Sequence, residues 1–149
     1  MEMTYNDALA RYNLLTNLKL SNDSGSISTD VKMKIIRNRI NLSKVKKEWD
    51  AYLQEFANAL NTDRFNELYE KERTPEEETE FKQIEAELNA IINKEMLAHS
   101  ESKVNAEYTK FTEDEFYEIT EFNVDNNPKI NGITLSAPDY LEMLYTLMV

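Results

Sequence analysis

The sequence has no cysteine, and its 149 residues include only two glycines and three prolines. Without cysteine, the chain cannot form a disulfide, a thiolate nucleophile, a zinc–thiolate site or an iron–sulfur cluster. All-β domains need many tight turns, and such turns usually need glycine or proline. The scarcity of both residue types therefore favours a mainly α fold with long helices and few chain reversals.

Long apolar runs are also missing. None approaches the ~20 residues that a membrane span needs, and Met1 to Thr4 lack the basic and apolar regions of a secretory signal. We therefore expect no membrane partner and a cytoplasmic location. Because 41% of the residues are hydrophobic and 10% are aromatic, the chain has enough apolar material for a packed core. Its length suits one domain, so we predict a single helical domain over residues 1–149.

The formal net charge is −11, which disfavours direct nucleic-acid binding because lysine and arginine are the residues that neutralise phosphates. Residues 29–50 are an exception, with seven basic and three acidic side chains, a local balance of +4 that leaves −15 for the remainder. The basic residues are Lys32, Lys34, Arg37, Arg39, Lys44, Lys46 and Lys47. Such a patch on an acidic molecule indicates internal charge pairing or head-to-tail self-association, ahead of a specific acidic partner.

The strongest periodic signal is a heptad stripe that steps alternately by four and three residues. It consists of Val31, Ile35, Asn38, Leu42, Val45, Trp49, Tyr52, Phe56 and Ala59. The stripe predicts one helix over about residues 29–61, roughly 46 Å long, with a pattern that is also typical of a coiled coil. Such a helix needs other helices or a second copy to bury its stripe. Asn38 either fixes register from a buried position or lies at an exposed part, which is the more ordinary interpretation.

A second long helix is predicted over about residues 75–98. Thr74-Pro75-Glu76-Glu77 has the residues of a capping box, with proline in the first turn. The apolar stripe that follows is Phe81, Ile84, Leu88 and Ile91. This stripe is the natural partner of the first one, so we predict a helical bundle around a long antiparallel helical hairpin.

Shorter elements flank the predicted hairpin. A first helix is predicted over residues 4–18, and a short one begins at Thr62 with a favourable cap. The C-terminal part, about residues 111–149, is predicted as an α/β-like appendage in which Thr112 begins a helix. Lys129–Leu135 alternates around Asn131-Gly132, which predicts a small β-hairpin or an extended segment near residues 119–135.

The sequence assembles no catalytic set. His99 is the only histidine; with Glu95 it makes at best half of a metal site, and a solvated histidine at a helix end is the ordinary interpretation. All-α nucleotide pyrophosphohydrolases hold Mg²⁺ with Glu-x-x-Glu on one helix and Glu-x-x-Asp on the next. Glu77-x-x-Glu80 fits the first half, but no convincing second half follows. We predict no catalytic residue, metal or cofactor, and keep all-α Mg-dependent nucleotide hydrolysis as an alternative.

The segment Met3-Thr4-Tyr5-Asn6-Asp7-Ala8-Leu9, followed by a long helix rich in lysine and asparagine, resembles small uncharacterised bacteriophage and prophage proteins. The acidic, cysteine-free composition is similar to that of proteins from AT-rich genomes. The resemblance assigns no functional residue. It implies virion assembly, or binding and blocking of a host protein, in the host cytoplasm or the virion.

The sequence therefore favours a non-catalytic, phage-derived protein-binding module that acts in assembly or inhibits a host protein. The predicted contacts with a protein partner or another copy are Trp49, Tyr52, Phe56, Tyr140, Leu144 and Tyr145. An alternative is an acidic mimic of nucleic acid that blocks a nuclease or polymerase. Its surface would consist of Glu76, Glu77, Glu80, Glu113, Asp114 and Glu118. The sequence leaves the partner and the oligomeric state open.

Overall fold

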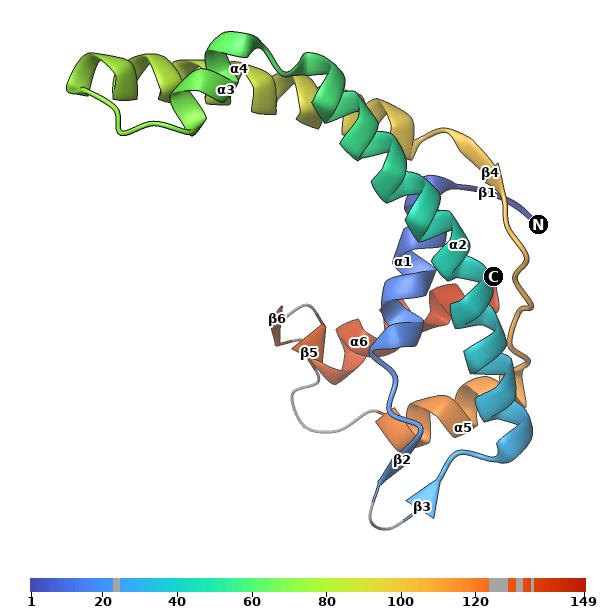
Figure 1. Cartoon of the computed structure of the whole chain (residues 1–149). Coiled ribbons are helices and arrows are strands. Elements are labelled where there is room, and N and C mark those ends of the chain that lie inside the picture. The colour runs from blue at the N-terminus through green and yellow to red at the C-terminus, as the bar shows by residue number, and fades with distance from the viewer. Residues whose placement is uncertain (23–24, 124–128, 131–132, 135) are drawn as a thin grey trace. The chain divides into compact units, whose positions relative to one another are not determined.

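Helices dominate the computed structural model, which describes residues 1–22, 25–123, 129–130, 133–134 and 136–149 (Figure 1). The helices are α1 (Tyr5–Thr16), α2 (Thr29–Leu60), α3 (Asp63–Tyr69), α4 (Pro75–Ser100), α5 (Glu113–Asn123), α6 (Ala137–Tyr145) and the 3₁₀ turn η1 (Thr146–Met148). The mainly α fold is thus confirmed. The two predicted long helices lie within two residues of their expected ends.

Short antiparallel strand pairs complete the described secondary structure. They are β1 (Glu2–Thr4) with β4 (Lys103–Asn105), β2 (Ser21–Asn22) with β3 (Gly25–Ser26), and β5 (Lys129–Ile130) with β6 (Ile133–Thr134). In the first pair, Met3 lies opposite Val104. The last pair lies in the segment where a small hairpin was predicted, and this minor β element is confirmed.

Local capping residues explain where the helices begin. The hydroxyls of Thr4, Thr62 and Thr74 each accept a hydrogen bond from the backbone N–H three residues later, at 3.1–3.2 Å. Thr74 and Glu77 complete the predicted capping box, because the Glu77 carboxylate also accepts from the Thr74 N–H at 3.1 Å. Thr112 makes the equivalent reciprocal pair at the start of α5. These bonds satisfy N–H groups that a helix leaves without intrahelical partners.

The chain divides into two compact units, so the predicted single domain contains two locally packed parts. Unit 1 comprises Met1–Lys46 and Lys103–Val149, and unit 2 comprises Lys47–Ser102. The 32-residue helix α2 contributes its first part to unit 1 and its second part to unit 2. Unit 2 holds 15 acidic and 6 basic residues. Of the net charge of −11, unit 2 therefore carries −9 and unit 1 carries −2.

The main hydrophobic core lies in unit 1. It includes the first part of the heptad stripe, with Ile35 and Leu42 fully buried, packed with Leu15 of α1 and Ile119 of α5. Each fully buried side chain of this size contributes about 1.5–3 kcal/mol relative to exposure. The C-terminal segment docks on this core, because Leu144 is also fully buried.

Two buried polar residues hold that segment in place. The Tyr108 hydroxyl donates to the Leu147 carbonyl oxygen at 2.6 Å, and burial raises the pKa of Tyr108. The Arg11 guanidinium donates to the Val149 main-chain oxygen at 3.0 Å and lies over the Tyr108 ring. The contacts between residues 11, 108 and 147–149 therefore join α1 and the chain after β4 to the C-terminal turn.

Asn38 is buried, with 1% of its surface exposed, so the interpretation of an exposed Asn38 is wrong. Its amide nitrogen donates to the Thr109 carbonyl oxygen at 2.8 Å, and the Thr109 N–H donates to its amide oxygen at 2.9 Å. Asn123 makes the same two bonds with the backbone of Lys19, at 3.2 and 2.6 Å. In both cases an asparagine side chain satisfies both main-chain groups of a residue outside the helices.

In unit 2, α4 runs antiparallel to the second part of α2. Trp49 stacks on His99, whereas Tyr52, further along α2, donates a hydrogen bond to Glu95, which lies earlier on α4. This order of contacts confirms the antiparallel hairpin. The burial along α4 is less complete than its stripe predicts, because Phe81 is buried but Ile91 is exposed.

Candidate functional site

The two carboxylates of the predicted hydrolase motif bind cations of the chain itself. Glu77 accepts from Lys71 and the Thr74 backbone, and these bonds lower its pKa to about 2. Glu80 accepts two bonds from Arg64 at 2.8 Å. Among the residues that the structure describes, no three His, Cys, Asp or Glu side chains converge as metal ligands would. The geometry therefore adds no support to the hydrolase alternative.

His99 is a packing residue, which corrects the interpretation of a solvated side chain. Its ring stacks on Tyr52 with 3.8 Å between centroids and on Trp49 with 5.4 Å. The Tyr52 hydroxyl donates to Glu95, and this bond to a carboxylate raises the pKa of Tyr52. The histidine therefore helps to join α2 to α4.

The predicted partner-binding residues fall into two groups in the structure. Trp49, Tyr140 and Leu144 are buried, so none of the three is available as a surface contact in this conformation. These residues lie on helix faces that pack against other parts of the same chain. Tyr52 and Phe56 are half-buried, and their rings stack on one another at 6.4 Å. Tyr145 is 55% exposed, and its role as a partner contact stays a prediction.

An exposed groove lies between α5 and α6. The hollow has a volume of about 390 Å³ and is lined by Tyr117, Thr120, Glu121 and Leu141. Tyr117 is 57% exposed. Tyr145 lies one helical turn beyond Leu141, and its ring packs edge-on against Phe116 at 6.2 Å. We refer to these four lining residues together with Tyr145 as the α5–α6 groove.

The two helices that border the α5–α6 groove are acidic. The two helices contain seven carboxylates and no basic residue: Glu113, Asp114, Glu115, Glu118, Glu121, Asp139 and Glu142. Three of these have partners in the chain. Glu115 binds Lys34 at 2.7 Å, Glu118 accepts from Ser28, and Glu113 accepts from the Tyr117 hydroxyl at 2.9 Å.

After these internal bonds, carboxylates without a cation partner in the described residues remain at the groove. Burial alone would raise the pKa of Glu115, but the bonds from Lys34 and Thr112 lower it overall, so the carboxylate is ionised at neutral pH. The bond to Glu113 raises the pKa of Tyr117, which keeps the hydroxyl protonated as a donor. Glu121, in the groove itself, has no cation partner in the part of the chain that the structure describes.

A basic face lies on the first part of α2. Met33, Arg37, Ile40 and Lys44 recur at intervals of four, three and four residues, so they share one side of the helix, and all four are exposed. Ile40 is 55% exposed, which is high for an isoleucine. We refer to these four residues as the α2 basic face. Arg37 and Lys44 have no carboxylate partner among the described residues.

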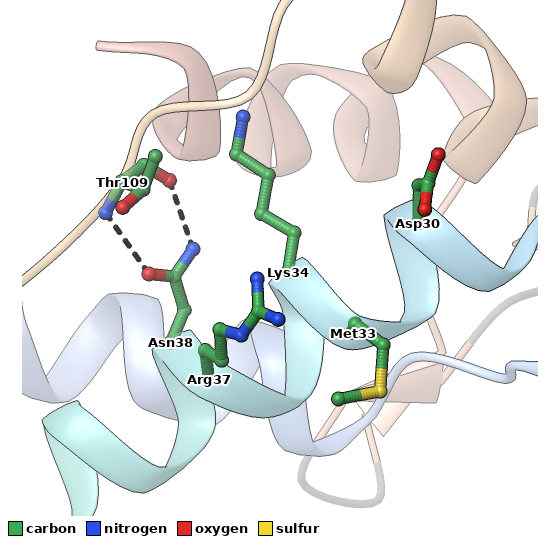
Figure 2. Close-up of a pocket in the computed structure, with 6 residues that line it drawn as sticks. All are labelled: Asp30, Met33, Lys34, Arg37, Asn38 and Thr109. Carbon is green, nitrogen blue, oxygen red and sulfur yellow. Dashed lines mark hydrogen bonds between the residues drawn. The ribbon is translucent and has the colours of Figure 1, made fainter.

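A hollow of about 380 Å³ borders this face. It is lined by Asp30, Met33, Lys34, Arg37, Asn38 and Thr109 (Figure 2). Figure 2 shows Asn38 bonded to the Thr109 backbone, with Lys34 and Arg37 projecting from α2 next to it. The amide of Asn38 is therefore occupied, and the groups that remain for a ligand include the Arg37 guanidinium, the Asp30 carboxylate and the apolar Met33 side chain.

Sequence reasoning found the basic patch that contains Arg37 and Lys44 and predicted Tyr145 as a contact, but it missed the groove and the exposed face that the two basic residues share with Met33 and Ile40. The heptad stripe drew attention to the buried side of α2, although Met33, Arg37, Ile40 and Lys44 form a second run at helical spacing. The groove also had a signal, because two tyrosine-containing segments carry acidic residues and no basic ones. Both patterns are present in the sequence, but the structure is needed to show that these residues are exposed.

Comparison with known proteins found no family model, curated protein or solved structure that matches this chain. The roles assigned here therefore come from the chain's own geometry. Among the helices in the described residues, none has the length and apolar character needed to cross a membrane.

Proposed function

We propose that this protein is a non-catalytic protein-binding module that presents helical surfaces to a protein partner or to copies of itself. The observation that supports it is the α5–α6 groove, where Tyr117, Leu141 and Tyr145 are exposed together above a packed core. Tyrosine combines a large apolar surface with a hydroxyl and is enriched at interfaces. Leu144, on the same helix as Leu141 and Tyr145, is fully buried in the core of unit 1 and so anchors α6.

The proposal extends to the origin and location of the protein. A phage-derived module would act in virion assembly or by inhibiting a host protein, in the host cytoplasm or the virion. The support for this part is compositional, from the acidic, cysteine-free sequence with its long lysine-rich helix.

Site-specific photo-cross-linking tests the binding role of the groove. A photoreactive amino acid in place of Tyr145 should cross-link to one protein in a bacterial lysate, or to another copy of the chain. Excess unlabelled protein should compete for the product. Tyr69 provides the control, since it is also an exposed tyrosine, at 67% against 55% for Tyr145, and lies on a helix of unit 2. Equal cross-linking from both positions, or none from Tyr145, would contradict the proposal.

Acidic mimicry is a second candidate, supported by the −9 charge of unit 2. Its predicted surface is weakened by internal bonds, because Glu77 and Glu80 bind Lys71 and Arg64, and Glu118 accepts from Ser28. A mimic should bind a basic nuclease or polymerase groove with strong dependence on salt. Binding that does not change between low and high salt would count against mimicry.

The non-catalytic part of the proposal has a direct test of its own. A panel of nucleoside triphosphates with Mg²⁺ or Mn²⁺ should show no hydrolysis above the buffer rate. Turnover that a Glu77→Gln variant abolishes would replace the binding module with the hydrolase alternative.

A further inference from the structure

We propose that the α2 basic face of one molecule docks in the α5–α6 groove of a second copy of this chain. The inference rests on the proposed binding function and names its partner. Both surfaces belong to unit 1 and both are exposed. Neither surface covers the other within one chain, so each is available to another molecule.

The first argument is charge complementarity. Residues 29–46 of α2 carry six basic side chains and one acidic side chain, whereas α5 and α6 carry seven acidic side chains and no basic one. Lys34 already binds Glu115, and Arg39 donates to the Leu15 carbonyl oxygen. Arg37 and Lys44 have no carboxylate partner in the described part of the chain, so they can bind carboxylates of another molecule. In the groove, Glu121 is the lining carboxylate that can receive one of them.

The second argument is the apolar match. On the α2 basic face, Met33 and Ile40 are seven residues apart, which separates them by about 10 Å along the helix. The groove offers Leu141 and the rings of Tyr117 and Tyr145. Apolar anchors at such helical spacing are the usual means by which a helix binds in a groove. The alternation of apolar and basic residues on the face therefore matches the aromatic and acidic residues of the groove.

Long-range repulsion does not oppose the contact strongly. Although the whole chain has a net charge of −11, unit 1 carries only −2 of it. At physiological salt, charges more than about 8 Å apart in solvent are largely screened. The local attraction between cations on α2 and carboxylates on α5 and α6 therefore outweighs the small net repulsion between two copies of unit 1.

Because the two surfaces differ, the contact has a defined symmetry. Two molecules can close as a two-fold dimer in which the contact occurs twice, or molecules can add head to tail in an open chain. In either case, a molecule with a damaged face and a molecule with a damaged groove still share one intact contact. This property gives the proposal a complementation test.

The test uses two variants and sedimentation velocity over a concentration series. The face variant carries Arg37→Glu and Lys44→Glu, and the groove variant carries Glu121→Lys and Tyr145→Ala. Wild type should self-associate, and each variant alone should do so about tenfold more weakly or not at all. An equimolar mixture of the two variants should recover a one-to-one complex. A control variant, Lys94→Glu with Tyr69→Ala, changes exposed residues of unit 2 and should associate as wild type.

Several results would overturn the inference. They are a wild type that stays monomeric at every concentration, variants that associate as wild type does, and a mixture of variants that fails to form the complex. Circular dichroism shows whether each variant keeps its helices; where a reversal unfolds the chain, Arg37→Gln and Glu121→Gln replace it. If wild type is monomeric but Tyr145 still cross-links to a different protein, self-docking fails while the proposed function stands. If neither occurs, both fail.

Discussion

Replacing Asn38 with leucine should destabilise the protein although leucine suits a heptad stripe better. The variant removes the two hydrogen bonds between the side chain and the Thr109 backbone, at 2.8 and 2.9 Å. Each such bond contributes about 0.5–1.5 kcal/mol net, so the expected loss is about 1–3 kcal/mol. Leucine is a better helix former than asparagine by roughly 0.5 kcal/mol, which offsets part of the loss.

Asn41→Leu is the matched control for this effect. Asn41 lies one turn further along α2 and is half-buried, and its side chain makes no hydrogen bond in the described part of the chain. Its replacement gains the helix propensity of leucine without losing a bond to Thr109. In urea denaturation followed by circular dichroism, the free energy of unfolding of Asn38→Leu should therefore be about 2 kcal/mol lower than that of Asn41→Leu, which is the middle of the expected range.

Hydrogen exchange at Thr109 provides a local readout. In wild type, the Thr109 N–H donates to Asn38 and should exchange slowly. In Asn38→Leu it should exchange much faster, whereas Asn41→Leu should leave it unchanged. Equal unfolding midpoints for the two variants, together with unchanged exchange at Thr109, would refute the claim that this bond pair holds the segment after β4.

Three further predictions concern other contacts. Asn123→Leu removes the two bonds to the Lys19 backbone and should lower the free energy of unfolding, measured by urea denaturation, by about 1–3 kcal/mol. Thr74→Ala removes the cap of α4 and should cost about 1 kcal/mol, with faster exchange of the Glu77 N–H. The pKa of Glu77 is about 2 in the folded chain, below its ordinary value of 4.5. The ionised carboxylate therefore contributes to the free energy of unfolding in full above about pH 4.5, and this contribution is lost as the pH falls toward 2. Acid titration followed by circular dichroism should show unfolding of unit 2 in this range, and Lys71→Gln should shift the transition to higher pH; an unshifted transition would contradict the assignment.

The helix starts could be predicted because they depend on residues three positions apart. Thr4, Thr62, Thr74 and Thr112 all cap the helices predicted for them. The same holds for the extent of α2, whose heptad stripe is a local pattern. Tertiary partners could not be predicted in this way, because Asn38 and Thr109 are 71 residues apart in the chain.

The candidate site shows a related limit of periodicity. A stripe indicates which residues share a face, but not whether the chain or a partner covers that face. Trp49 and Leu144 were therefore predicted as partner contacts and are buried inside the molecule. Tyr145, at the end of α6, remains exposed. The basic residues Arg37 and Lys44 were recognised in the sequence, but the exposed face that they share with Met33 and Ile40 is defined by which side of the helix is covered.

The paired hydrogen bonds from Asn38 to Thr109 and from Asn123 to Lys19 also determine which of these residues can be substituted. Asn38 and Asn123 bind main-chain groups, which every residue except proline provides in full. The side chain of Thr109 is exposed and takes no part in the pair. Replacing residue 109 should therefore change the stability little as long as proline is avoided, whereas replacing Asn38 removes both hydrogen bonds. Protein engineers could use the chain around position 109 to insert a label or a new side chain without disturbing the helix that holds it.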